Sequence, residues 1–204
     1  MRVLPCGSAA LLVEVDDLEA VLGLYDALRA DPPPGVVDLV PAARTVLVVL
    51  DPRVSTPAAV AGAVRSVPWR PERRREGALV TVPVVYDGDD LAEAAAALGC
   101  DPPELVRRHT AAEWTVAFCG FAPGFGYLTA PQWRVEVPRR AVPRTRVPQG
   151  AVALAAGYSG VYPRASPGGW QLVGRTALPV FDPDRDPPAL LAPGTRVRFT
   201  AVPR

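Results

Sequence analysis

Residues 114–129 read WTVAFCGFAPGFGYLT, in which a strand-forming run passes into a turn with three glycines and a proline. The run predicts a short strand over residues 115–121. The remainder of the chain continues this pattern, with further short runs between Gly and Pro at residues 133–137, 151–155, 170–175 and 195–202. Several short strands with frequent turn signals are typical of a β-barrel or β-sandwich.

The first part of the chain has a different pattern, in which strand and helix signals alternate. Its predicted order is strand 11–15, helix 18–28, strands 36–40 and 45–50, helix 56–67 and strand 79–86. Asp17 and Thr56 stand where the two helices begin, and both are suitable N-cap residues. This order resembles a split β-α-β unit of the ferredoxin type.

A charged, proline-flanked segment, residues 68–77, separates these patterns and has no regular period. We interpret it as a solvated linker and domain boundary. Two short helices follow, one over residues 89–98 and one that begins at Asp101, which precedes two prolines and Glu104. The prediction is an α+β protein, with a small N-terminal α/β domain over residues 1–77 and a second domain over residues 78–204.

The composition is that of an ordinary globular protein and excludes several activities. The net charge of +1 argues against a general electrostatic hold on nucleic acid. No apolar run has the length of a membrane span and the N-terminus lacks a clear signal sequence, so we expect a cytoplasmic protein without a membrane partner. All 22 basic residues are arginine, which excludes a Schiff-base lysine, a Walker-A lysine and biotinyl-lysine in this chain.

The usual catalytic groups are scarce. A single histidine, His109, excludes a multi-histidine metal site, and three dispersed cysteines predict neither a zinc site nor a disulfide framework. His109 lies near the end of a predicted helix, where a packed histidine is the simpler interpretation, but it is the candidate catalytic residue. For Cys119 we favour a buried thiol over a nucleophile, because the one histidine that could activate it is remote in sequence.

Two segments combine features of a binding site. In the first, residues 118–128, glycines let the backbone approach a ligand while rings enclose it. An aromatic turn packed into the core fits this segment equally well. Its predicted substrate contacts are Phe121, Pro123, Gly124, Phe125 and Tyr127. In the second, residues 137–150, four arginines lie among three prolines. In an extended chain Arg144 and Arg146 project from one face and could together hold a carboxylate or phosphate, although a solvated edge strand is the alternative.

A third segment, residues 158–176, contains a Gly168-Gly169 pair that suits a tight hairpin turn. Its predicted substrate contacts are Ser166, Gly168, Gly169, Trp170 and Arg175. A plain hairpin explains much of this pattern. Because glycines and rings recur here, we expect residues 166–175 and the aromatic turn 121–127 to line one concave pocket.

Taken together, GFAPGFGYL, PRRAVPRTRVPQGAVALAAG and GVYPRASPGGWQLVGRT resemble the signature of the 5-oxoprolinase B-subunit family, also called allophanate hydrolase subunit 1. The resemblance covers most of the chain, including the RRHT stretch around His109. Relatives of that family include a sporulation-kinase inhibitor and part of the carboxyltransferase domain of urea carboxylase. The chain departs from the family pattern at residues 129–133 and at Tyr158-Ser159, so the polar lining of the pocket is expected to differ.

The resemblance implies a ferredoxin-like N-terminal domain and a cyclophilin-like C-terminal β-barrel. It also implies two partners, a C-like subunit, related to allophanate hydrolase subunit 2, and an A-like subunit. The complex would open 5-oxo-L-proline to L-glutamate with ATP, and this chain would supply half of a composite site and be inactive alone. The complex would then need ATP, whereas this chain would carry neither a metal nor covalent biotin. The alternatives are a carboxyltransferase component acting on urea-like amides and a regulator that binds a protein kinase.

Overall fold

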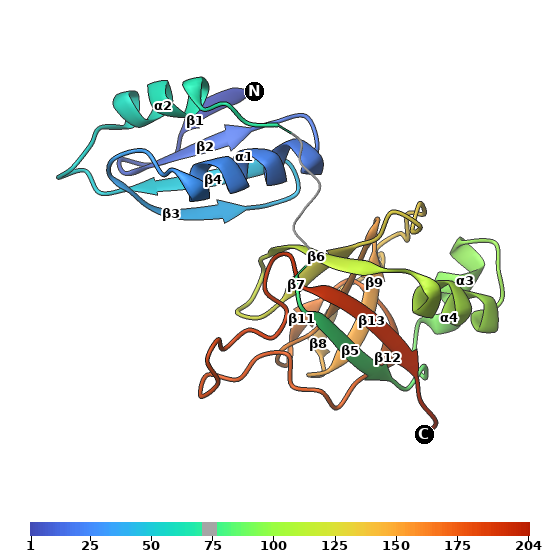
Figure 1. Ribbon diagram of the computed structural model, residues 1–204. Coiled ribbons are helices and arrows are strands. Elements are labelled where there is room, and N and C mark those ends of the chain that lie inside the picture. Colours follow the sequence, from blue (N-terminus) through green and yellow to red (C-terminus); the bar gives the residue numbers. More distant parts are fainter. Residues whose placement is uncertain (71–76) are drawn as a thin grey trace. The chain divides into compact units, whose positions relative to one another are not determined.

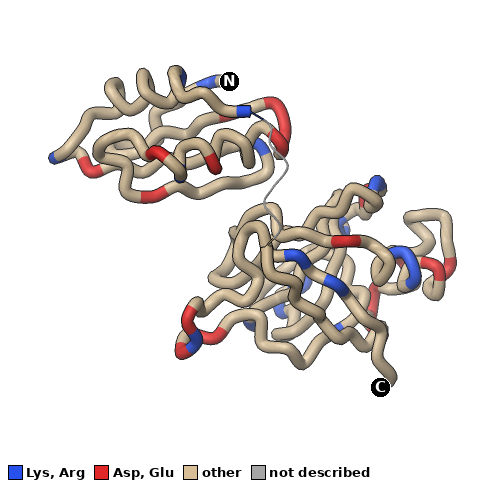
Figure 2. Tube along the Cα trace, viewed as in Figure 1, with Lys and Arg blue, Asp and Glu red and all other residues tan. Residues whose placement is uncertain are grey.

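The structure is a computed structural model that describes residues 1–70 and 77–204 (Figure 1). Contacts between Cα atoms divide the chain into two compact units, Met1–Arg74 and Arg75–Arg204. The predicted boundary segment, residues 68–77, falls mostly outside the described residues, so its role as a linker stays a prediction. Acidic and basic positions are interspersed along the traces of both units (Figure 2).

The first unit is a four-stranded antiparallel sheet packed against two helices. Its elements are β1 (Arg2–Pro5), β2 (Ala10–Glu14), α1 (Leu18–Ala30), β3 (Val36–Pro41), β4 (Thr45–Leu50) and α2 (Pro57–Ser66), in the sheet order β1-β2-β4-β3. The Asp17 carboxylate accepts a hydrogen bond from the Ala20 N–H at 2.8 Å, and Thr56 caps α2 in the same way. Both predicted N-caps are therefore confirmed. Alternate residues of β2 and β4 are buried in one core with the helices.

Residues 79–86, the last strand of the predicted ferredoxin-type order, form part of the second unit. There β5 (Leu79–Val84) pairs in parallel with β13 (Arg196–Ala201), and alternate side chains of β5 are buried in the second core. In the first unit β1 takes the sheet edge beside β2. No sequence pattern indicated β1, because a short edge strand pairs on one side only and buries little of either face.

The second unit is a seven-stranded sheet that curves into a nearly closed barrel. Its order is β12-β9-β10-β7-β6-β13-β5, with β6 (Trp114–Cys119), β7 (Gly126–Thr129), β9 (Ala151–Ala155), β10 (Tyr158–Val161) and β12 (Gln171–Arg175). After β5 the chain returns along β12, where Val85 and Arg175 exchange two backbone hydrogen bonds of 2.9 Å. This contact joins the two ends of the sheet, and the predicted α+β class is confirmed.

Two helices pack on this barrel, α3 (Leu91–Ala97) against β12 and α4 (Pro102–Ala111) against β13. The Asp101 side chain caps α4 by accepting from the Glu104 N–H at 2.9 Å, as its sequence indicated. The predicted strand over residues 133–137 was wrong: only Val137 forms a bridge, with Ala156. The reason is that Trp133 closes a turn, donating its backbone N–H to the Ala130 carbonyl, and buries its ring in the core.

Strand β9 separates two buried clusters of the second unit. Val152 and Leu154 face the main core, to which all seven strands contribute. The alanines of β9 face the other way, toward a smaller cluster that includes Phe125, Tyr162 and Trp170. The small two-stranded sheet of β8 (Arg144–Val147) and β11 (Ser166–Gly168) adds Val147 to that cluster. Because alanine is small, β9 allows large rings to pack closely on this outer face.

Candidate functional site

The turn between β6 and β7 is a rigid loop with unusual backbone geometry. The Ala122 N–H donates to the Gly120 carbonyl at 2.7 Å, a three-residue γ-turn, and the Phe125 N–H donates to the Ala122 carbonyl at 3.0 Å. Phe121, at the centre of the γ-turn, has φ of 67°. Gly124 has φ of 78°, and a Cβ atom there would lie 2.5 Å from the Phe181 Cβ. The turn therefore needs glycine at position 124 and holds Phe121 in a strained conformation.

The aromatic turn and residues 166–175 meet in one cluster of rings. Phe125 makes edge-to-face contacts with Tyr162 at 5.2 Å and with Trp170 at 5.3 Å, and Tyr127 contacts Trp170 at 5.4 Å. The expected proximity is confirmed. We define the aromatic cluster as the connected rings Phe118, Phe121, Phe125, Tyr127, Tyr158, Tyr162 and Trp170. Phe125, Tyr162 and Trp170 are buried against one another, so the concave pocket expected between them stays a prediction.

The predicted hairpin at Gly168-Gly169 is wrong in its pairing. Strand β11 pairs with β8, whereas β12 pairs with β9 in the barrel. The difference arises because Trp170 turns into the aromatic cluster between the two strands, while Gly168 lies directly against the Tyr162 hydroxyl. Gly169 packs beside Pro143. These contacts place Ser166, Gly168 and Gly169 next to the arginines of β8 and its preceding loop.

The arginine segment, residues 138–146, is attached to the barrel by a buried carboxylate that sequence reasoning missed. Asp90 is 2% exposed and receives two hydrogen bonds from the Arg144 guanidinium, at 2.7 and 2.9 Å. Arg140 also pairs with Asp90, and the Leu172 backbone N–H donates to it at 2.8 Å. Asp90 stands at the N-cap position of α3, but its carboxylate makes no capping hydrogen bond. It pairs with Arg144 and Arg140 and accepts from the Leu172 N–H instead.

The electrostatics of this contact favour an ionised Asp90. Burial by itself raises the pKa of the Asp90 carboxyl, but the hydrogen bonds from Arg144 and Leu172 and the charges of Arg144 and Arg140 hold that pKa below its usual value. The acidic group that Arg144 holds in this structure is thus the protein's own, whereas the prediction assigned it a carboxylate or phosphate of the substrate or nucleotide. Arg146 is exposed, and its substrate contact stays a prediction.

Two further predicted site residues, Arg175 and His109, belong to neither the aromatic cluster nor the arginine segment. Arg175 forms an ion pair with Asp87 at 3.0 Å, where the chain returns along β12. His109 is 0% exposed in the main core, with Nδ1 at 2.7 Å from the Tyr86 hydroxyl and Nε2 at 2.8 Å from the Ser159 hydroxyl. Burial lowers the pKa of His109 to about 3, so the ring is neutral with both nitrogens in hydrogen bonds. This is the arrangement of a packed histidine rather than of a group that touches substrate.

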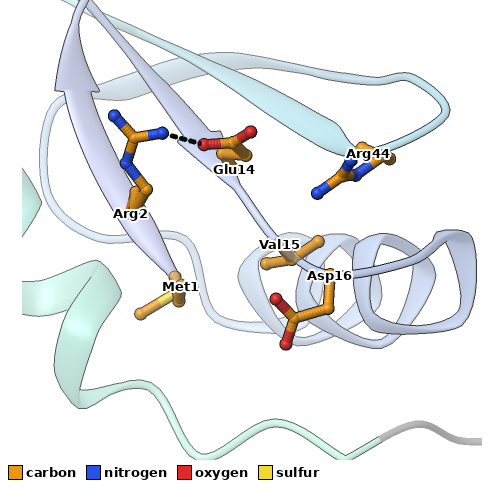
Figure 3. Close-up of a pocket in the computed structure, with 6 residues that line it drawn as sticks. All are labelled: Met1, Arg2, Glu14, Val15, Asp16 and Arg44. Atoms are coloured by element: carbon orange, nitrogen blue, oxygen red, sulfur yellow. Dashed lines mark hydrogen bonds and ion pairs between the residues drawn. The ribbon is translucent and has the colours of Figure 1, made fainter.

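Two other features, the Cys119 thiol and a pocket in the first unit, involve none of the predicted substrate contacts. The Cys119 thiol is half-buried and donates to the Leu191 carbonyl at 3.3 Å. A pocket in the first unit is lined by Met1, Arg2, Glu14, Val15, Asp16 and Arg44, and contains none of the predicted contacts. Figure 3 shows the Arg2 guanidinium directed at Glu14 on the neighbouring strand, an ion pair of 2.8 Å. Among residues 1–70 and 77–204, no three His, Cys, Asp or Glu side chains group as metal ligands would.

Comparison with known proteins assigns the class. The family model described as carboxyltransferase domain, subdomain C and D, matches residues 1–191. The fold and these motifs thus define a carboxyltransferase-domain protein. The chain is 42% identical over 172 residues to the B subunit of 5-oxoprolinase from Escherichia coli O157:H7. The aligned region covers 81% of this chain and 78% of that protein. The chain belongs to the 5-oxoprolinase B-subunit family, as its motifs predicted.

Solved structures share the fold. The crystal structure of TTHA0988 superposes with a TM-score of 0.77 at 37% identity, over 96% of this chain and 40% of that chain. Kluyveromyces lactis urea carboxylase superposes with a TM-score of 0.76 over 100% of this chain and 23% of that enzyme, and at 19% identity this shows the fold alone. The chain therefore spans only a part of each of these longer polypeptides. None of the helices formed by residues 1–70 and 77–204 has the length and apolar character that a membrane crossing requires.

Proposed function

We propose that this chain is the B subunit of an ATP-dependent 5-oxoprolinase complex and supplies half of a composite site that opens 5-oxo-L-proline to L-glutamate. The observation that carries the proposal is the 42% identity to the B subunit of a 5-oxoprolinase, across 78% of that protein. The same proposal places the chain in the cytoplasm, where ATP is available.

The chemistry explains why such a chain would need partners. A lactam carbonyl is a poor electrophile, and phosphorylating its oxygen turns that oxygen into a leaving group for later hydrolysis. This chain has no lysine to place on ATP phosphates or to carry biotin. We therefore assign ATP to the complex, with no metal and no covalent biotin in this chain. The A-like and C-like subunits would supply the remaining groups.

On this chain, the substrate would meet the solvent-accessible side of the aromatic cluster and the arginine segment. Arg146 and Arg139 are exposed and could bind the carboxylate of 5-oxo-L-proline. Tyr127 is half-buried at the edge of the cluster, beside the buried rings of Phe125 and Trp170. The Asp90 contact would hold the arginine segment in place beside these rings.

Reconstitution tests the proposal. The purified chain is mixed with the A-like and C-like subunits of the same organism, and ATP-dependent release of glutamate from 5-oxo-L-proline is measured. We expect activity from the three-protein mixture and none when any one protein is omitted. Robust glutamate release by this chain alone, or none from the complete mixture, would refute the proposal.

A carboxyltransferase component acting on urea-like amides is the second candidate, favoured by the match to a carboxyltransferase-domain model over residues 1–191. It predicts that the same mixture acts on urea only when a biotin carboxylase and its carrier are added. Testing urea and 5-oxo-L-proline side by side, with and without avidin, separates the two candidates.

A further inference from the structure

Two tyrosines of the aromatic cluster, Tyr127 and Tyr158, end in hydroxyl groups that the described part of the chain does not use. On the paired strands β7 and β10, where Leu128 lies opposite Ser159, the two tyrosines are diagonal neighbours on one face. Their rings meet edge-on at a centroid distance of 5.6 Å, and both side chains are half-buried. Within residues 1–70 and 77–204, neither hydroxyl has a hydrogen-bond partner, so both are available to a ligand.

The rings around this pair fix where the two hydroxyls lie. Tyr127 stacks on Phe118 at 4.5 Å and meets Trp170 edge-on at 5.4 Å. Tyr158 meets Phe118 edge-on at 5.8 Å. Burial raises the pKa of Tyr158, and the neighbouring Tyr127 phenol raises it further, because the two hydroxyls are close together. Since packing already orders both rings, they lose little side-chain entropy on binding.

Arg139 is exposed, but its backbone is tied to the barrel on both sides. The Pro138 carbonyl accepts from the Gln171 side-chain amide at 3.2 Å. The Arg140 N–H donates to the Gly169 carbonyl at 2.9 Å. In the described chain the Arg139 guanidinium makes no ion pair, unlike that of Arg140. The arginine segment therefore holds an unpaired cation on a fixed stretch of backbone.

The charges that act on the tyrosines of the cluster are positive. Burial raises the pKa of Tyr127 and of Tyr162, and the Arg139 charge opposes both rises. Arg144 acts on Tyr162 in the same sense. Among the described residues, no carboxylate contributes to the pKa of Tyr127, Tyr158 or Tyr162. An unpaired guanidinium beside two hydroxyls, without a competing carboxylate, is a setting that favours an anionic ligand.

We propose that Arg139, Tyr127 and Tyr158 form one subsite for a lactam acid, in which the guanidinium pairs with the carboxylate and the two hydroxyls bind the amide edge. This rests on the proposed function and names the groups that contact 5-oxo-L-proline. A five-membered lactam is a cis amide, so its C=O and N–H lie side by side. One hydroxyl donates to the carbonyl and the other accepts from the N–H. Urea has such an edge but no carboxylate, so Arg139 selects the acid over the neutral amide.

The test is an NMR titration of the full chain, labelled at its five tyrosines and assigned with Tyr→Phe variants. The probes are 5-oxo-L-proline, urea and 2-pyrrolidinone, which is the same lactam without the carboxylate. We expect 5-oxo-L-proline to shift the signals of Tyr127 and Tyr158. The signals of Tyr86, beside the main core, and of Tyr25, in the first unit, should stay in place. Urea and 2-pyrrolidinone should bind at least about tenfold more weakly, because they lack the charge-assisted contact.

Three variants assign the contacts. Arg139→Ala should weaken binding of 5-oxo-L-proline at least about tenfold and leave that of 2-pyrrolidinone within about threefold. Arg198→Ala is the matched control, because Arg198 is also an exposed arginine of the second unit but lies on β13, and its affinity should stay within about threefold of the parent. Tyr158→Phe removes only a hydroxyl and should weaken binding of both lactams alike, by about three- to tenfold.

Two results overturn the proposal. One is the absence of a response of Tyr127 and Tyr158 to 5-oxo-L-proline, and the other is an affinity of Arg139→Ala within about threefold of the parent. Equal binding of 5-oxo-L-proline and 2-pyrrolidinone counts with the second, since it leaves the carboxylate unrecognised. The proposed function fails separately. A complete three-protein mixture that releases no glutamate refutes that function, whereas an Arg139-dependent response of the two tyrosines in this chain alone still establishes the subsite.

Discussion

Acidification from pH 7 to pH 5 should destabilise this protein through one side chain. His109 is the only histidine, and no other side chain has an ordinary pKa between 5 and 8. Burial lowers its pKa from 6.5 to about 3. In the folded state the ring stays neutral, while in the unfolded state it takes up a proton below about pH 6.5. The stability from this shift is therefore complete above the unfolded pKa and is lost as the pH falls toward 3.

The size of the effect follows from proton linkage. With an unfolded pKa of 6.5 and a folded pKa of about 3, the free energy of unfolding falls by about 2 kcal/mol between pH 7 and pH 5. This is a large part of the roughly 5 to 15 kcal/mol that stabilises a typical protein. Carboxyl groups with lowered pKa, such as Asp90 and Glu104, lose their contribution mainly at lower pH.

The assay is urea unfolding at pH 7, 6 and 5, followed by tryptophan fluorescence, because Trp114 and Trp133 contact the His109 ring at 5.1 and 5.9 Å. His109→Gln cannot titrate, so it should be less stable at pH 7 but lose less than about 0.5 kcal/mol on going to pH 5. An NMR titration of the parent is an independent check, and the His109 ring signals should not move down to pH 5. Equal stability of the parent at pH 7 and pH 5, or equal pH dependence of parent and variant, would contradict the reasoning.

Three further outcomes are expected. Asp90→Asn should cost about 3 to 5 kcal/mol of unfolding free energy, because it removes the buried negative charge that Arg144 and Arg140 share, while Asp89→Asn, whose side chain is 80% exposed, should cost less than about 1 kcal/mol. Gly124→Ala should cost about 1 to 3 kcal/mol more than Gly7→Ala, because both positions have positive φ but only Gly124 lacks room for a Cβ. Arg146→Lys should leave the urea midpoint unchanged and raise the KM for 5-oxo-L-proline at least about threefold in the reconstituted complex, and an unchanged KM would mark Arg146 as a solvated residue.

Local patterns in the sequence determined the elements whose stability is itself local. Asp17, Thr56 and Asp101 were identified as helix caps, because an N-cap hydrogen bond joins residues only three apart. Strand β9 was predicted with its observed bounds, since its run of small and β-branched residues lies between two turn signals. The three long motifs were sufficient to identify the family, because together they compare many residues at once.

Only the tertiary structure decided which distant groups pair. Residues 79–84 can form a strand in the first unit or in the second, and their place beside β13 depends on a partner more than a hundred residues away. The Asp90 carboxylate meets Arg144 across 54 residues, and His109 meets Ser159 across 50, so no local spacing distinguishes these groups from solvated ones. Burial then sets their protonation, because the cost of removing a charge from water depends on what the fold places around it.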